Sequence, residues 1–169
     1  TLMGSYRVLS QGLIAGLREF GITAEMAMPG AAFGQSAKLP KNGACFDAPS
    51  FYEISVGRKK LMGSAQVRKK GTLLQHGSLL LEFSPAQLVS LLRFSKPEES
   101  ERCQRVLEAK ATSLLQVLGY LPDPGHLAQT IAAEFGRTLE IDLIPAALTE
   151  QEWQQATVLA QEKFGSDEW

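Results

Sequence analysis

The sequence predicts an α+β domain, and three observations support that prediction. An apolar stripe with helical spacing opens the chain, strand-like segments joined by tight turns occupy its middle, and helical patterns fill its C-terminal half. Of the 169 residues, 44% are apolar and 21% are charged, which is ordinary for a globular chain long enough to bury a core. We therefore expect a mixed sheet flanked by helices, followed by a helical C-terminal part.

The composition also narrows the class of protein. A formal net charge of −1 argues against general nucleic-acid binding. Cys45 and Cys103 lie in dissimilar settings, so we expect no disulfide framework and a reducing, cytoplasmic compartment. The sequence has no signal peptide and no apolar run long enough for a bilayer, so no membrane association is predicted.

The first predicted element is a helix from Ser5 to Phe20. Its apolar residues recur at steps of three and four: Tyr6, Leu9, Leu13, Leu17 and Phe20. Ser5 is a suitable N-cap, and Gly21 is a suitable C-terminal stop. A strand over Ile22–Met28 follows, and the segment Gly30–Asn42, rich in small residues, predicts a mobile loop.

The middle of the chain predicts a meander of three strands. After a short apolar stretch and a turn at 47–50, the predicted strands are Tyr52–Val56, Lys60–Gln66 and Thr72–Phe83. Gly57-Arg58 and Lys69-Lys70-Gly71 have the composition of tight reversals, which makes the strands antiparallel neighbours.

The next region is predicted to be mainly helical. Ser84 as N-cap and Pro85 at the first helical position begin a helix that runs to about Phe94. Ser95–Arg105 is polar and predicts a solvated loop or the start of a helix, and Ala109–Leu118 is apolar enough for a second helix.

Three elements are predicted for the C-terminal region. Pro124–Phe135 has helical spacing, Leu139–Ile144 resembles a short strand, and Glu150–Lys163 is predicted to be the last helix. Thr149 and Glu152 form the pattern of a capping box at the start of that helix.

Cys45 is the first candidate for a reactive side chain. Small neighbours and the Pro-Ser turn after it leave a thiolate accessible, and a thiolate is the nucleophilic form of cysteine. The alternative is a small buried core residue, because free cysteines are often buried. His76 lies on the same meander and could pair with Cys45, or it could be a structural hydrogen-bonding residue beside Gly77, whereas His126 is expected at the surface.

A run of six positive charges between Arg58 and Lys70 contains no acidic residue. It predicts either a patch for an acidic partner or a solvated hairpin. Lys60 differs from the other basic residues because Gly63 and Ser64 follow it closely and leave space for a ligand beside its ammonium.

Simple strand alternation makes a further prediction about the neighbours of Lys60. It places Met62 and Ser64 on the face of Lys60, Leu61 on the other face, and Lys59 in solvent. The sequence has no phosphate-binding glycine motif and no metal-ligand spacing, so no metal site is predicted.

One stretch resembles a known family. The segment CFDAPSFYEISV, the motif GRKKLMGSAQ at Gly57–Gln66 and the motif LQHGSLL at Leu74–Leu80 resemble the lipoate–protein ligase A and octanoyltransferase family, which is related to biotin protein ligases. The resemblance covers nearly the whole chain and implies a biotin/lipoate protein ligase-like fold. The family's arginine- and glycine-rich segment is not in this sequence, so we expect residues 1–96 to be the C-terminal part of the catalytic domain and residues 97–169 a helical extension.

The resemblance implies roles for individual residues. Lys60 matches the lysine that binds the acyl carbonyl, and Cys45 matches the cysteine that carries the acyl group as a thioester. The residues expected to bind substrate surround these motifs: Gly63, Ser64, Ala65, His76 and Gly77. The residues expected to bind acidic partner domains are Arg68, Lys69 and Lys70.

The implied reaction is the transfer of an octanoyl group from acyl carrier protein to a lysine of a lipoyl domain or of glycine cleavage H protein. Octanoate or lipoate is the group carried, and the transfer needs no cofactor. One alternative is an ATP-dependent lipoate–protein ligase, which would need ATP and Mg²⁺ and in which Cys45 is incidental. The other is a truncated, non-catalytic module that binds carrier proteins. For the enzyme, the resemblance also implies a missing or separate N-terminal half that supplies the rest of the site, without which these 169 residues would be inactive.

Overall fold

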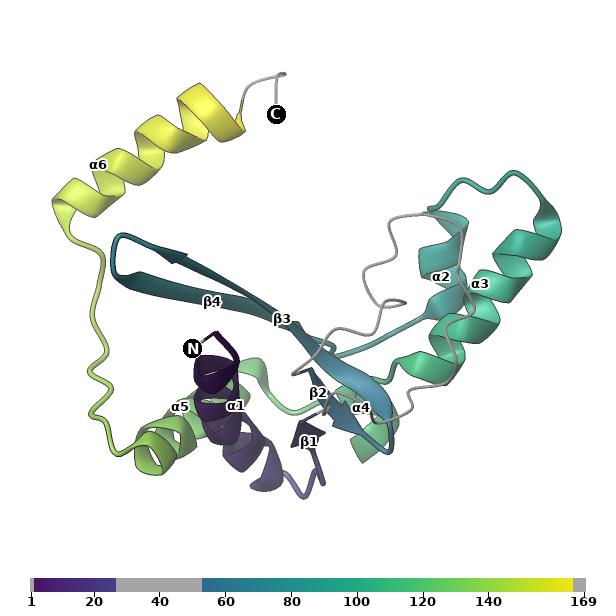
Figure 1. The fold of residues 1–169 in the computed structure, drawn as a ribbon, viewed down its shortest axis with the longest axis horizontal. Coiled ribbons are helices and arrows are strands. Elements are labelled where there is room, and N and C mark those ends of the chain that lie inside the picture. Colours follow the sequence, from purple (N-terminus) through teal and green to yellow (C-terminus); the bar gives the residue numbers. More distant parts are fainter. Residues whose placement is uncertain (1, 27–52, 166–169) are drawn as a thin grey trace.

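The computed structural model describes residues 2–26 and 53–165, and their arrangement confirms an α+β fold (Figure 1). The four described strands form one antiparallel sheet in the order β1-β2-β3-β4. The strands are β1 Glu25–Met26, β2 Ile54–Val56, β3 Lys59–Lys69 and β4 Thr72–Leu79. We expected a sheet with both parallel and antiparallel pairing. Among the described residues, the parallel pairing consists of one isolated bridge between Lys60 and Ala111.

The two predicted reversals are confirmed. Gly57 and Arg58 both have positive φ, at 54° and 66°, and so do Lys70 and Gly71, at 51° and 78°. Two successive residues with positive φ are typical of the turn whose twist suits an antiparallel hairpin. The strand β3 is longer than predicted, so the basic residues lie at the two ends of a long hairpin.

Helix α1 (Leu2–Arg18) packs against α5 (Pro124–Leu139) through two glycines spaced four residues apart. A Cβ atom on Gly16 would lie 2.7 Å from Ile131 Cα, and one on Gly12 would lie 2.9 Å from Phe135 Cα. Helices α1 and α5 therefore lie closer together than they could if Gly12 and Gly16 were larger residues. The main core lies between these helices and the sheet: Ile14, Leu17, Ile22, Ala24, Ile54, Leu61, Leu114 and Leu127.

A second, smaller core joins α2 (Pro85–Ser90) to α3 (Pro97–Lys110), as Figure 1 shows at the end of the molecule opposite α6. Its buried residues are Val89, Cys103 and Leu107. The predicted cap is confirmed, since Ser84 Oγ accepts a hydrogen bond from the Gln87 amide. This packing crosses the predicted boundary between residues 96 and 97, which stays a prediction.

The helix predicted over Ala109–Leu118 is interrupted. Helix α3 ends at Lys110, Ala111 is extended beside β3, and α4 (Leu114–Leu118) begins after Ser113, whose hydroxyl accepts from the Gln116 amide. The Thr112 amide donates to the Lys60 carbonyl at 2.9 Å. Pairing with the sheet and a new N-cap therefore replace the continuous helix, and the polar stretch before it forms most of α3.

The strand predicted over Leu139–Ile144 is wrong. Helix α5 continues to Leu139, and Glu140 ends it with φ 54°, in the left-handed region. The Ile141 amide donates to the Gly136 carbonyl, which closes the helix end and leaves no strand pairing. The segment from Ile141 to Thr149 is described but forms neither helix nor strand.

Helix α6 (Glu150–Leu159) begins with the predicted capping box and continues into a π-helical turn over Ala160–Phe164. Hydrogen bonds from the backbone and hydroxyl of Thr149 lower the pKa of Glu152. Figure 1 shows α6 beyond the turn end of the β3–β4 hairpin, and none of its residues is buried. No described helix is long and apolar enough to cross a membrane.

Candidate functional site

A β-bulge at Leu61 determines which way Lys60 points. Ser55 pairs with Lys60 and Ile54 pairs with Met62, so Leu61 is an extra residue on β3. Leu61 is buried in the main core, and the partly buried Met62 packs against that core. A Cβ atom on Gly63 would meet the Lys60 side chain, so Lys60 and Gly63 share the opposite face of the sheet, which we call the open face.

The bulge corrects the prediction from simple alternation. Lys60 does not share a face with Met62 and Ser64, because the extra residue reverses the alternation between Lys60 and the rest of β3. Directly paired residues share a face, and Gly63 pairs with Ser78 while Ala65 pairs with His76.

The predicted substrate-binding residues are therefore divided between the two faces. Gly63, Ala65 and His76 belong to the open face with Lys60, and His76 is exposed. Ser64 and Gly77 belong to the other face, since a Cβ atom on Gly77 would lie 2.8 Å from Ser64 Oγ. The Tyr6 hydroxyl on α1 donates to the Ser64 carbonyl on that side, at 3.5 Å.

Lys60 is buried, with 8% of its surface exposed, and its ammonium is ion-paired with the carboxylate of Glu53, which is 7% exposed. Glu53 precedes β2, two residues before Ser55, the strand partner of Lys60. Lys59 is exposed, as predicted, and its ammonium donates to the Glu108 carbonyl at 2.8 Å. Two adjacent lysines thus have different surroundings.

Sequence reasoning missed Glu53. The available signal was an acidic residue inside a short apolar strand, at a position where a carboxylate needs a partner. The partner could not be identified from spacing, because the turn at Gly57-Arg58 and the bulge at Leu61 together bring Lys60 to it.

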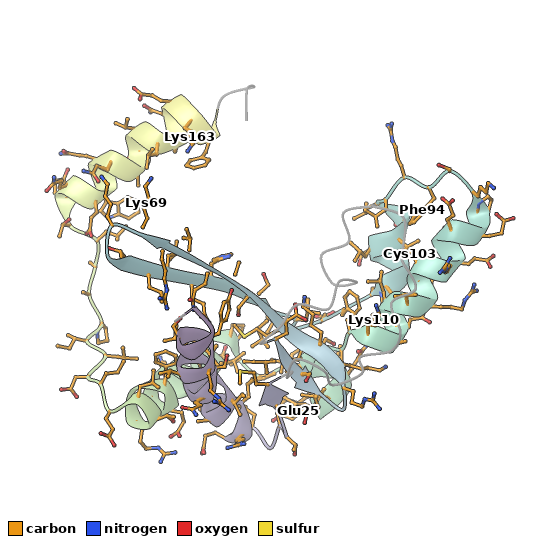
Figure 2. All side chains as sticks on the ribbon, in the orientation of Figure 1. Glu25, Lys69, Phe94, Cys103, Lys110 and Lys163 are labelled. Carbon is orange, nitrogen blue, oxygen red and sulfur yellow. The ribbon has the colours of Figure 1, made fainter. Side chains whose placement is uncertain are left out.

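The predicted partner-binding residues lie at the far end of the hairpin. Lys69 follows Lys60 by nine positions along β3, or about 30 Å at about 3.3 Å per residue. Figure 2 shows Lys69 at the turn end and Lys110 at the opposite end, near the start of β3. The Arg68 guanidinium donates to Ser5 Oγ on α1, so this residue also links the hairpin to the helix.

The remaining candidates lie elsewhere. Cys45 lies outside the described residues. Cys103 is buried in the second core, with 1% exposed. His126 is exposed, and its ring contacts Phe20 edge to face, with ring centroids 5.5 Å apart. The described residues contain no group of three or more acidic, histidine or cysteine side chains that could hold a metal ion.

Comparison with known proteins identifies the relatives of this chain. The Lipoyl protein ligase A/B catalytic domain family matches residues 1–136. Octanoyltransferase LipM of Kyrpidia tusciae is 41% identical over 165 residues, and that of Bacillus subtilis is 36% identical over 170 residues. The alignments cover 98% and 100% of this chain, and the chain spans 60% and 61% of the length of these two relatives.

Two solved structures share the fold. One describes a bipartite lipoate protein ligase and its E2 lipoyl domain from Thermoplasma acidophilum, with a TM-score of 0.75, 19% identity and coverage of 99% of this chain and 57% of that chain. The other is lipoate-protein ligase A bound with ATP, with a TM-score of 0.71, 21% identity and coverage of 100% and 59%. At these identities the likeness concerns the fold alone.

Proposed function

Because the chain belongs to the lipoyl protein ligase A/B catalytic domain family, we propose that it transfers an octanoyl group to a lysine of a lipoyl domain or of glycine cleavage H protein. The names of the relatives that are 35–41% identical support octanoyl transfer as the reaction. The observation that carries the proposal is the buried ammonium of Lys60, which lies over a glycine on the open face.

The chemistry follows from the two reactive side chains. The Cys45 thiolate attacks the carbonyl carbon of octanoyl-acyl carrier protein, a new C–S bond forms, and the carrier thiolate leaves. The acceptor lysine then attacks the Cys45 thioester, loses a proton and releases the cysteine. Negative charge develops on the carbonyl oxygen in both steps, and the Lys60 ammonium stabilises it as a charge-assisted hydrogen-bond donor.

The small residues of the motif shape the approach to Lys60. Gly63 and Ala65 on the open face leave room for an acyl chain beside the ammonium, with His76 on the neighbouring strand. Ser64 and Gly77 lie on the other face, where a Cβ atom on Gly77 would meet β3 and the Tyr6 hydroxyl of α1 donates to the Ser64 carbonyl. In this proposal Ser64 and Gly77 support the pocket wall from the face of the sheet opposite the acyl chain.

The hairpin end supplies the contact with acidic partners. Lys69 and Lys70 are exposed beside the turn, and Arg68 precedes them. Acyl carrier protein as the donor, and lipoyl domains or glycine cleavage H protein as acceptors, are the partners we propose. The basic turn end of the hairpin lies about 30 Å from Lys60 along β3. A partner of protein size could therefore contact the basic turn end and the region of Lys60 at the same time.

An ATP-dependent lipoate–protein ligase is the second candidate. The fold likeness to lipoate-protein ligase A bound with ATP favours it. Such a ligase requires ATP and Mg²⁺ to activate the free acid, whereas octanoyl transfer from a thioester requires no cofactor.

One experiment separates the candidates. Purified protein is mixed with a lipoyl domain and either octanoyl-acyl carrier protein or octanoate with ATP and Mg²⁺, and acylation of the domain is followed by mass spectrometry. We expect acylation with the thioester donor and an intermediate of one octanoyl mass that hydroxylamine releases. Cys45→Ser should not form this intermediate. Acylation only with ATP would indicate the ligase, and no acylation with either donor would indicate a binding module.

A further inference from the structure

We propose that the backbone N–H of Thr112 positions Lys60 for acyl transfer, so that the residues linking α3 to α4 belong to the catalytic apparatus. We call these residues, 111–113, the connector. The inference rests on the proposed function, because it concerns Lys60 as the hydrogen-bond donor to the acyl carbonyl. Thr112 is a positioning residue, since it acts through the backbone of Lys60.

The first step of the argument is the place of Lys60 in the sheet. Towards β2, the bulge at Leu61 interrupts the regular pairing directly after Lys60. Towards β4, the paired residues of β3 run from Met62 to Lys69, and β4 ends at Leu79. The paired register of β3 and β4 therefore stops two residues short of Lys60.

The second step is that the connector occupies this edge of β3. The Thr112 amide donates to the Lys60 carbonyl at 2.9 Å, and Ala111 forms the parallel bridge with Lys60. Figure 2 shows Lys110, the residue before the connector, near the start of β3. A buried backbone carbonyl needs a hydrogen-bond donor, and a strand edge that lacks one opens locally. At Lys60, the Thr112 amide thus takes the place that β4 has further along β3.

The third step is that the connector is itself well held. Its residues Ala111, Thr112 and Ser113 are 2%, 6% and 0% exposed. The Ala111 amide donates to the Leu107 carbonyl at the end of α3, and Ser113 is the N-cap of α4. The Thr112 hydroxyl donates to the Gln116 side chain at 3.2 Å. The two helices therefore determine where the Thr112 amide lies.

The chemical consequence concerns the placement of a hydrogen-bond donor. A donor stabilises a developing negative charge best when it is in place before the reaction, because no reorganisation is then needed. A misplacement of about 1 Å can cost about 10²-fold in rate. Without the Thr112 hydrogen bond, the backbone of Lys60 can shift and carry its side chain away from the acyl carbonyl. The loss should affect the transition state more than binding of the octanoyl donor.

The test replaces one backbone N–H by an oxygen atom. Thr112 is exchanged for its α-hydroxy acid by amber suppression, which creates an ester and keeps the side chain. Transfer from octanoyl-acyl carrier protein to a lipoyl domain is then measured. We expect kcat to fall at least about tenfold, while KM for the octanoyl donor changes by less than about threefold.

The same exchange at Leu114 is the matched control. The Leu114 amide donates to the Leu80 carbonyl, also at 2.9 Å, and so links the start of α4 to the residue after β4. Each ester removes one backbone hydrogen bond, so the two proteins should unfold at similar denaturant concentrations. The kcat of the Leu114 ester should stay within about threefold of that of the unmodified protein, because the lost bond does not involve Lys60.

The outcomes separate this inference from the proposed function. Equal losses of kcat in the two esters would overturn the proposal, because the connector would then act through overall stability. A Thr112 ester that folds and keeps the unmodified kcat would overturn the role of Thr112 alone. Failure of the unmodified protein to acylate a lipoyl domain would contradict the proposed function, and this inference with it.

Amide hydrogen exchange of the unmodified protein decides where the Thr112 ester does not fold. Protection of the Thr112 amide as strong as that of the Leu114 amide would support the proposal. Exchange of the Thr112 amide at the rate of an exposed amide would overturn it, because the hydrogen bond to Lys60 would then not persist in solution.

Discussion

The side chain of Lys60 lies across Gly63, with Cε 2.9 Å and Nζ 3.2 Å from the position that a Cβ atom on Gly63 would take. A methyl group at Gly63 must therefore displace the lysine, and the far end of a flexible side chain can move. We expect Gly63→Ala to lower acyl transfer at least about tenfold, because misplacing a donor weakens oxyanion stabilisation. Single-turnover transfer from octanoyl-acyl carrier protein measures this loss.

Gly77→Ala provides the contrast. Its Cβ atom would lie 2.6 Å from the Gly63 carbonyl oxygen, which is backbone and cannot move away easily. This variant should lower the free energy of unfolding, whereas Gly63→Ala should change it little. Equal melting temperatures for the two variants, with equal activity, would contradict the assignment of the glycines to different faces.

Lys60 and Lys59 should respond differently to truncation. Removing the Lys60 ammonium as Ala or Gln should lower transfer by roughly 10²–10³, the usual cost of one oxyanion donor. Lys59→Ala removes an exposed charge bonded to the Glu108 carbonyl and should change the rate by less than about threefold. Rates of both variants are compared with circular dichroism as the folding control. Equal losses at the two positions would show that the family motif has been assigned to the wrong lysine.

The basic hairpin end should influence association more than chemistry. Reversing Lys69 and Lys70 to Glu should slow association with an acidic carrier domain and weaken its salt dependence, because exposed charges steer encounter. Stopped-flow binding at several salt concentrations measures the effect. Arg68→Glu should also destabilise the protein, since Arg68 donates to Ser5 on α1. Association rates that do not change at low salt would leave this end as an ordinary solvated turn.

The contact between α1 and α5 should be sensitive to small changes. In Gly16→Ala the new Cβ would lie 2.7 Å from Ile131 Cα. Overpacking typically costs about 1–3 kcal/mol, which exceeds the gain of about 1 kcal/mol that Ala brings to a helix interior. The variant should therefore unfold at lower denaturant. Gln11→Ala, at an exposed position on the same helix, should not; greater stability of Gly16→Ala would contradict the close packing.

Much of the fold was predictable because many of its signals are local. The reversals at Gly57-Arg58 and Lys70-Gly71, the caps at Ser84 and Thr149, and the stripe of α1 each depend on residues a few positions apart. The strand expected over Leu139–Ile144 did not form, because the helix before it continues to Leu139. Among the described residues no strand pairs with this segment, and the Ile141 amide donates to the Gly136 carbonyl at the end of α5.

The sequence by itself determined the family, the motif lysine and the turns that make β2, β3 and β4 neighbours, because these reside in contiguous residues. Only the tertiary structure decided which face Lys60 occupies, since the bulge at Leu61 arises from pairing with β2. It also decided that Glu53 meets Lys60 and that Ala111 leaves its helix to pair beside it. The contact with Ala111 joins segments distant along the chain, whereas Glu53 and Lys60 are seven positions apart and meet because of the turn and the bulge. The energies of both contacts depend on burial that no local pattern encodes.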